Sequence, residues 1–159
     1  MPCLNVRQRR DAISTLSYQP FERRSDMPEI DWNSLRHNAF RVMRNAYAPY
    51  SGFPVGAAAL TAGGSIVSGC NVENVSYGLG VCAETVLVGN FCSSGGGRLL
   101  AIAVCDSHGE ILMPCGRCRQ VLYEHGGPEL LVDHRDGPVP LARLLPDAFG
   151  PDDLAAGRK

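Results

Sequence analysis

Three cysteines with metal-ligand spacing constrain this chain more than any other feature. A Cys-Ala-Glu sequence at 82–84 is followed about thirty residues later by Pro-Cys-Gly-Arg-Cys at 114–118. Structural zinc sites usually have four protein ligands, whereas catalytic sites keep three and leave one position for water. The spacing therefore predicts a catalytic zinc site formed by Cys82, Cys115 and Cys118, and the fold must bring these two segments together.

Glu84 is the candidate general acid and base. It stands two residues after Cys82, where a carboxylate can lie beside a water at the metal without being a ligand. Such a carboxylate can take a proton from water and deliver it to a ring nitrogen and a leaving amine. Considered alone, Glu84 is better explained as a solvated residue in a first helical turn, where the helix dipole favours carboxylates. Cys115-x-x-Cys118 alone also permits a redox site or half of a zinc finger.

Composition favours one globular domain acting on a small neutral substrate. The chain has 159 residues, 45% of them hydrophobic, and a net charge of −1 that would attract neither nucleic acid nor an anionic membrane. We expect a cytoplasmic protein, because the sequence contains no run of transmembrane length and no hydrophobic leader. Seven cysteines in such a chain favour metal binding or free thiols over disulfides. We expect Cys70, Cys92 and Cys105 to be small core residues.

Residues 1–26 differ from the rest of the chain in composition and hydrophobic pattern. Arginines are scattered among polar residues there, with little periodic hydrophobicity. We expect either a disordered extension or an upstream-extended start, in which case translation would begin at Met27. Residues 27–159 are expected to form a single catalytic domain.

The remaining pattern alternates helices and strands. Asp31 can cap a helix that ends before Pro49, and Gly63-Gly64 joins the first two strands. The expected strands are 55–62, 65–70, 99–105, a short one around 111, and 129–133. One later helix is expected to begin near residue 82, and another to run over 116–125. This order predicts an α/β fold with helices packed on a central sheet.

The expected helix starts matter for the metal ligands. Cys82 and Cys115 both lie at such starts, where exposed N–H groups and the helix dipole favour thiolate over thiol. Three thiolates around Zn²⁺ leave a formal charge of −1, so positive compensation is expected nearby. Arg117 and Arg119 are the candidates, and their alternative role is that of solvated helix residues.

Several sequence blocks resemble the small homotetrameric, zinc-dependent cytidine deaminases. They occupy 50–58, 69–74, 82–84 and 114–120, within about residues 30–149. The arrangement of Cys-x-Glu with Pro-Cys-x-x-Cys corresponds to the signature of zinc deaminases. The resemblance implies a three-layer α/β/α sandwich with a mixed sheet of about five strands and one Zn²⁺ per subunit. It also implies hydrolysis of cytidine and deoxycytidine to uridine and deoxyuridine plus ammonia, in pyrimidine salvage.

The resemblance further implies substrate contacts in a homotetramer with composite active sites. Asn71 and Glu73 would hold the ribose 3′-hydroxyl, although the same residues could simply cap a loop. Phe53 would stack on the pyrimidine, although a core role is the usual one for an aromatic residue. Ala83 is another implied substrate contact. Tyr77 and Phe149 would reach a neighbouring subunit's site.

One position departs from the resemblance. Many family members have an arginine directly after the catalytic glutamate, where it donates hydrogen bonds to the zinc thiolates, but this chain has Thr85. Thr85 supplies one neutral donor, so we hypothesise that Arg117 or Arg119 supplies part of the missing charge.

Three other functions are compatible with parts of this pattern. A polynucleotide cytosine deaminase would need a basic channel with stacking aromatics, which a near-neutral chain with 7% aromatics does not suggest. A deaminase of another aminated nucleoside or base would use the same zinc site. A non-enzymatic zinc module would need a fourth ligand, for which His108, His125 and His134 are available.

Overall fold

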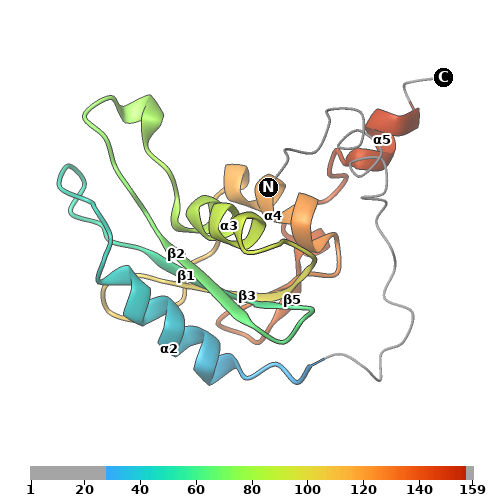
Figure 1. The fold of residues 1–159 in the computed structure, drawn as a ribbon, viewed down its shortest axis with the longest axis horizontal. Coiled ribbons are helices and arrows are strands. Elements are labelled where there is room, and N and C mark those ends of the chain that lie inside the picture. The colour runs from blue at the N-terminus through green and yellow to red at the C-terminus, as the bar shows by residue number, and fades with distance from the viewer. Residues whose placement is uncertain (1–27, 157–159) are drawn as a thin grey trace, which may run out of the picture.

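The computed structural model describes residues 28–156, so the expectations for residues 1–26 lie outside the described residues. The elements run in chain order as shown in Figure 1: α2 (Trp32–Met43), β1 (Gly56–Thr61), β2 (Ile66–Cys70), η2 (Tyr77–Leu79), α3 (Ala83–Ser93), β3 (Leu99–Cys105), α4 (Gly116–Gly126), β4 (Leu131–Val132), β5 (Val139–Pro140), η3 (Leu141–Arg143) and α5 (Pro151–Ala156). Within the described part of the chain, no helix has the length and apolar character needed to cross a bilayer.

A five-stranded mixed sheet forms the centre of the molecule. Its strand order is β2-β1-β3-β4-β5, and all neighbouring strands are antiparallel except β3 and β4. The parallel pair places Ala101 opposite Leu131. The connection between these two strands contains α4, as expected for a parallel crossover.

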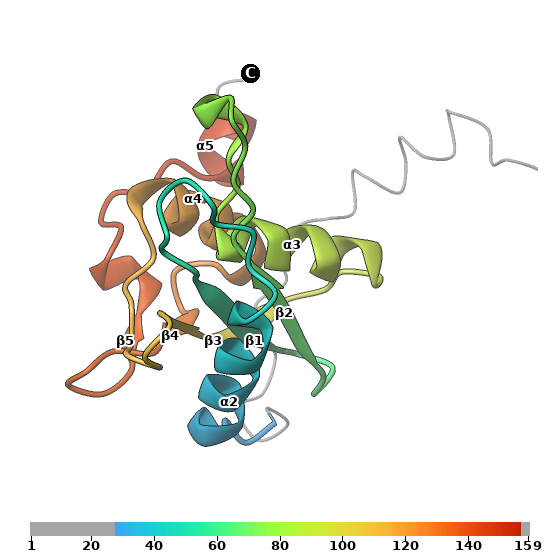
Figure 2. The ribbon, with the colours of Figure 1, turned by 90° about the vertical axis from the view of Figure 1, so that its left-hand side faces the viewer.

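Helices cover both faces of the sheet. Helix α2 lies on one face, and α3 and α4 lie on the other (Figures 1 and 2). Because both faces are covered, β1 and β3 are buried along their whole length. Alternate β3 residues enter different cores, with Ile102 on the α3 side and Ala101 and Ala103 on the α2 side. The expected three-layer α/β/α fold is confirmed.

Glycine lets the helices approach the first two strands closely. A Cβ at Gly56 would lie 2.0 Å from the Ala39 carbonyl oxygen in α2, and a Cβ at Gly69 would lie 2.4 Å from the Leu87 nitrogen in α3. Helix α3, which carries Glu84, is therefore set directly on the main chain of β2.

The first helix begins as expected and ends early. Asp31 caps it by accepting a 3.0 Å hydrogen bond from the Ser34 N–H. Beyond Met43 the chain leaves the helix, and Tyr47 pairs instead with the segment at 71–73: its N–H donates to the Asn71 carbonyl oxygen, and its own carbonyl accepts from the Glu73 N–H. This pairing brings the loops 47–55 and 71–80 together.

The structure corrects some local expectations. Strand β5 and helix α5 were not expected, and Ile111 forms a single bridge with Cys105 rather than a strand. Cys105 is buried as expected, but Cys70 is only half-buried, and the core role expected for Cys92 is wrong because that residue is exposed. Cys92 lies one position after Phe91, the last buried residue of α3, and so points away from the core.

An ion pair between an exposed arginine and a buried aspartate fixes α2 to the far half of the sheet. Arg36 in α2 donates from Nε and Nη2 to the two carboxylate oxygens of Asp133, at 2.7 and 2.8 Å. The Asp133 side chain is only 1% exposed and follows β4 directly. A bidentate pair of this kind fixes orientation as well as position.

Candidate active site

The three predicted ligands meet where α3 and α4 begin. Cys82 is the N-cap of α3, Cys115 is the N-cap of α4, and Cys118 lies in the first turn of α4. Their sulfur atoms all lie within 4.8 Å of one another. Cys118 is fully buried, Cys82 is half-buried and Cys115 is exposed, so one side of the group stays accessible. The spacing prediction is confirmed at the level of geometry.

The donor set fits a catalytic zinc ion. Soft thiolates are preferred zinc ligands, and three of them leave one position for water in a tetrahedral arrangement. No histidine joins this group within residues 28–156. The alternative of a closed structural site with His108, His125 or His134 as fourth ligand is therefore not supported.

The charges of the thiols also call for a cation. Burial raises the pKa of Cys118, and the negative charges of Glu84 and Cys82 raise it further. Burial likewise raises the pKa of Cys82. For Cys115 burial acts in the same direction, but hydrogen bonds from the Cys118 backbone and from the other two thiols outweigh it and lower the pKa. Three adjacent thiolates therefore need a cation at their centre, and a bound divalent metal deprotonates its thiols outright.

Glu84 lies beside this group in a protected position. It is in the first turn of α3 and only 5% exposed, so the alternative of a solvated surface carboxylate is wrong. Burial raises its pKa, although hydrogen bonds from its own backbone and from Cys118 act in the opposite direction. A carboxyl group whose pKa is shifted toward neutrality can both accept and donate protons near pH 7.

Thr85, the departure from the family pattern, lies half-buried in the same turn. Its Oγ1 atom is buried and has no hydrogen-bond partner among the described residues. A buried hydroxyl without a partner is uncommon in folded proteins. Its contribution to the charge balance of the metal site remains a prediction.

Asn71 and Glu73 connect the two loops beside the site. Asn71 accepts from the Val55 N–H at 2.8 Å and donates to the Phe53 carbonyl oxygen at 3.0 Å. Glu73 accepts from the Ser51 hydroxyl and N–H and from the Tyr50 N–H. The Ser51 hydroxyl is the main reason why the pKa of Glu73 is lowered. Both side chains thus do hold a loop, and their substrate contacts remain a prediction.

A cavity of about 320 Å³ lies between these loops. Its lining comprises Tyr50, Ser51, Glu73, Asn74, Tyr77 and Gly80. Of the residues implied by the resemblance, Glu73 and Tyr77 line this cavity. The sequence did not identify the other four lining residues, because nothing in their residue types distinguishes them from ordinary turn residues. These are Tyr50, Ser51, Asn74 and Gly80.

The implied aromatic contacts are exposed. Phe53 is 52% exposed, Tyr77 81% and Phe149 62%. A core role for Phe53 is therefore excluded by its exposure. Ala83, in contrast, is fully buried at the first position of α3, so its backbone rather than its side chain is the part that can face a ligand.

The two candidate arginines differ in their surroundings. The Arg117 side chain is exposed and makes no hydrogen bond to any residue in 28–156. Arg119 is half-buried and donates to two carbonyl oxygens, those of Pro114 and Leu144, each at 2.8 Å. The next residue, Gln120, donates to the Phe149 carbonyl oxygen. Charge compensation by either arginine remains a prediction.

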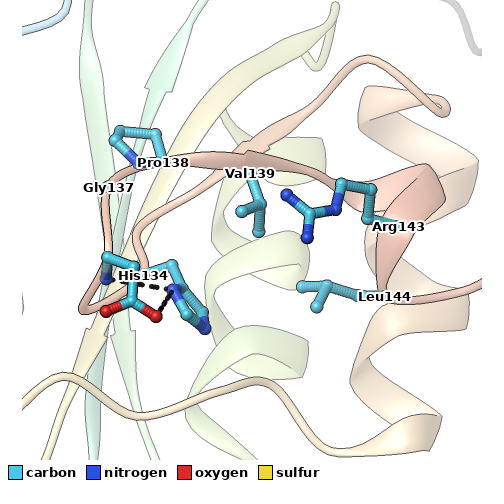
Figure 3. A pocket seen from close by; sticks show the side chains of 7 residues that line it. His134, Gly137, Pro138, Val139, Arg143 and Leu144 are labelled. Atoms are coloured by element: carbon cyan, nitrogen blue, oxygen red, sulfur yellow. Dashed lines mark hydrogen bonds and ion pairs between the residues drawn. The ribbon is translucent and has the colours of Figure 1, made fainter.

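A second cavity, of about 210 Å³, lies at the hairpin between β4 and β5 (Figure 3). His134, Asp136 and Arg143 contribute its polar groups. His134 Nδ1 accepts a 3.1 Å hydrogen bond from the Asp136 N–H. None of the predicted metal, catalytic or substrate-binding residues lines this cavity.

Comparisons with known proteins agree with this geometry. A family model described as the cytidine and deoxycytidylate deaminase zinc-binding region matches residues 31–133. The cytidine deaminase of Mycobacterium tuberculosis is 62% identical over 133 residues, which cover 84% of this chain and 100% of that protein. A crystal structure of cytidine deaminase from M. tuberculosis superposes with a TM-score of 0.76 at 63% identity, covering 77% of this chain and 99% of that chain. The cytidine deaminase structure from Mycobacterium leprae gives a TM-score of 0.73 at 49% identity, over 75% of this chain and 100% of that one. The chain belongs to the cytidine and deoxycytidylate deaminase family.

Proposed function

We propose that this protein hydrolyses cytidine and deoxycytidine to uridine and deoxyuridine with release of ammonia. The observation that carries the proposal is the meeting of three cysteine sulfurs within 4.8 Å, beside a glutamate that is 5% exposed. The related proteins that bear the name cytidine deaminase support the choice of substrate.

The metal ligands and the proton carrier have separate tasks. Cys82, Cys115 and Cys118 would hold a zinc ion, which when bound supplies a Lewis acid that makes water acidic enough to react near pH 7. Glu84 accepts a proton from the water that attacks C4 and passes it to N3 of the ring. It then takes the second proton of that water, from the hydroxyl now on C4, and delivers it to the amine, so that the C4–N bond breaks as the C4 carbonyl forms and the products are uridine and ammonia.

The loops would recognise the nucleoside. Glu73 keeps acceptor capacity after its bonds to the loop 50–51, and Asn71 has an amide whose oxygen and nitrogen can each make more than one bond. Both side chains can therefore form hydrogen bonds with a ribose hydroxyl. Phe53 would stack on the pyrimidine, and the N–H of Ala83 at the start of α3 would face the base, because the first N–H groups of a helix have no partner within the helix.

We further propose a homotetramer in which neighbouring subunits complete each site. The loop at 72–79 exposes Val75 to 77%, Tyr77 to 81% and Leu79 to 67%, and Phe149 adds another exposed aromatic. Contiguous exposed apolar groups mark an interaction surface. Light scattering after gel filtration measures the assembly, and a fully active monomer would contradict composite sites.

The remaining expectations are consistent with this function and stay proposals. Free thiols that must remain reduced to bind zinc favour the cytoplasm, and the reaction would serve pyrimidine salvage. Residues 27–159 are proposed as one catalytic domain. Arg117 and Arg119 are proposed to supply positive charge that offsets the negative charge of the thiolates, and Thr85 is proposed to supply one neutral donor.

The decisive experiment measures turnover of cytidine, deoxycytidine, cytosine and single-stranded DNA by protein of known zinc content. We expect turnover of the two nucleosides only. Glu84→Gln is isosteric but cannot carry the proton, so it should keep zinc and lose about 10²-fold to 10⁴-fold in kcat.

Two results would contradict the proposal. No turnover by fully zinc-loaded protein would move the assignment to another aminated nucleoside or base. Substantial activity of Glu84→Gln would remove Glu84 from its role.

A further inference from the structure

The C-terminal segment that carries Phe149 is attached to α4 by two consecutive residues. Arg119 donates from Nη1 to the Leu144 carbonyl oxygen, and Gln120 donates from Nε2 to the Phe149 carbonyl oxygen, both at 2.8 Å. They are the first and second residues after Cys118. The segment 144–149 is therefore fixed at its two ends to the helix whose start provides two metal ligands.

Arg119 also contacts the metal-ligand loop itself. Its Nε donates to the Pro114 carbonyl oxygen at 2.8 Å, and Pro114 is fully buried immediately before Cys115. One guanidinium thus joins the carbonyls of two segments that are far apart in sequence. The planar fork of arginine can do this, whereas the single ammonium of lysine cannot reproduce the geometry.

The same side of α4 packs against the next residue of the segment. A Cβ at Gly150 would lie 3.0 Å from Cε1 of Tyr123, so glycine allows the chain to pass close to this ring. Tyr123 stands four residues after Arg119, on the same helical face. The main chain around Phe149 is thus anchored, while the Phe149 side chain remains 62% exposed.

We propose that Arg119 and Gln120 are positioning residues that couple the metal-ligand loop to the placement of Phe149. The bridge consists of these two side chains and the carbonyls of Pro114, Leu144 and Phe149. Ordering of the ligand loop by metal then stabilises the segment 144–149, and loss of metal loosens it. The effect on substrate affinity in a neighbouring subunit rests on the proposed function, but the bridge itself rests on the hydrogen bonds described.

Hydrogen exchange tests the bridge without any turnover. Wild-type protein is compared with zinc bound and after removal of zinc by a chelator, and exchange is followed in peptides that cover 144–149. Removal of zinc should speed exchange there in the wild type. In Arg119→Met, exchange should already be fast with zinc bound and should change little on removal. A wild-type segment that does not respond to zinc would overturn the coupling, whatever the substrate proves to be.

Kinetics separate the two arms of the bridge. Gln120→Leu breaks only the bond to Phe149 and should raise KM about threefold to tenfold with little change in kcat and an unchanged rate of zinc release. Arg119→Met also breaks the bond to Pro114 and should raise KM about tenfold or more and speed zinc release. An unchanged KM in zinc-loaded, tetrameric Arg119→Met would overturn the proposal.

Three further variants distinguish the bridge from a simple charge effect. Arg119→Lys keeps the charge but loses the fork, so full rescue by lysine would favour charge compensation over the bridge. Arg117→Met removes the same charge from the same helix without removing a hydrogen bond, and a KM rise equal to that of Arg119→Met would also overturn the bridge. Arg135→Met, which removes an exposed arginine from the β4–β5 hairpin, is the control for loss of charge alone.

Discussion

The metal-ligand region and the substrate loops differ in how far a single chain completes them. Glu84 is 5% exposed and Cys118 is fully buried where α3 and α4 begin, whereas Tyr77 in the loop region is 81% exposed. The first region is fixed by helix packing against the sheet. The second leaves large apolar side chains without cover. The proposed proton transfer and the metal binding are therefore expected to depend on the fold of one chain, and substrate recognition is expected to depend on assembly.

The largest effect should come from removing a metal ligand. Cys118→Ser replaces the buried thiol by a poor zinc ligand, and zinc affinity should fall by more than about 100-fold, since even loss of a ligand's supporting partner can cost this much. Metal analysis and cytidine turnover measure the loss. Cys92→Ser changes an exposed cysteine outside the group and should alter neither quantity. Zinc retention by Cys118→Ser would mean that the ligand set is misassigned.

The packing of the first region can be tested at Gly69. A Cβ there would lie 2.7 Å from the Ala83 carbonyl oxygen, as well as close to Leu87. Gly69→Ala should therefore lower the free energy of unfolding by about 1–3 kcal/mol. Thermal unfolding at fixed protein concentration measures this change.

Gly89 offers a matched control on α3. Nothing lies within 4 Å of a Cβ added at Gly89. Gly89→Ala should therefore stabilise the protein by about 0.5–1 kcal/mol, the opposite sign. If both substitutions stabilise the protein, the close approach of α3 to β2 is not tight.

The loop region should respond differently. Tyr77→Ser removes the most exposed aromatic side chain of this loop. If Tyr77 is central to the interface, its loss should weaken assembly by about 2 kcal/mol, while zinc content stays unchanged because no metal ligand is touched. Light scattering over a dilution series measures the assembly. An intact tetramer with an unchanged KM would place the interface elsewhere and weaken the contrast between the two regions.

The smallest effect concerns the charge of Glu73. The hydroxyl of Ser51 lowers the pKa of Glu73, which keeps the carboxylate ionised to lower pH. In Ser51→Ala this pKa should rise, so the acceptor is lost at a higher pH. As the pH is lowered, KM for cytidine should therefore increase about twofold to fivefold in Ser51→Ala. In the wild type the same increase should occur only at a lower pH. Ser94→Ala, at the end of α3, serves as the control, and identical pH profiles for all three proteins would contradict a substrate role for the Glu73 carboxylate.

Much of the fold could be predicted because local signals agreed with tertiary packing. Strand β3 was expected at 99–105 and found as Leu99–Cys105, and α4 differs from expectation by one residue. Strand β5 was missed because it has two residues, one of them Pro140, and exists only by pairing with β4. A strand that short leaves no periodic pattern in the sequence.

The site likewise contains residues that the sequence predicts and contacts that it does not. The ligands Cys115 and Cys118 and the neighbouring Glu84 follow from spacing, because the required chemistry needs those residue types at those positions. The contacts of Arg119 and Gln120 do not, since their partners are main-chain carbonyls that every residue possesses. The break after Met43 was also hidden, because the pairing of Tyr47 with the segment at 71–73 is a long-range event.

The glycines at 56 and 69 have a consequence for motion. Gly56 sets the main chain of β1 against α2, and Gly69 sets β2 against α3 on the opposite face. Neither helix can slide over these strands without a main-chain collision. The helix layers therefore cannot move past the sheet by shear. Opening for a nucleoside must instead occur in the loops 47–55 and 71–80, whose hydrogen bonds can break and re-form. The time that a substrate spends bound is then expected to depend on these loops, while the metal-ligand region keeps its position.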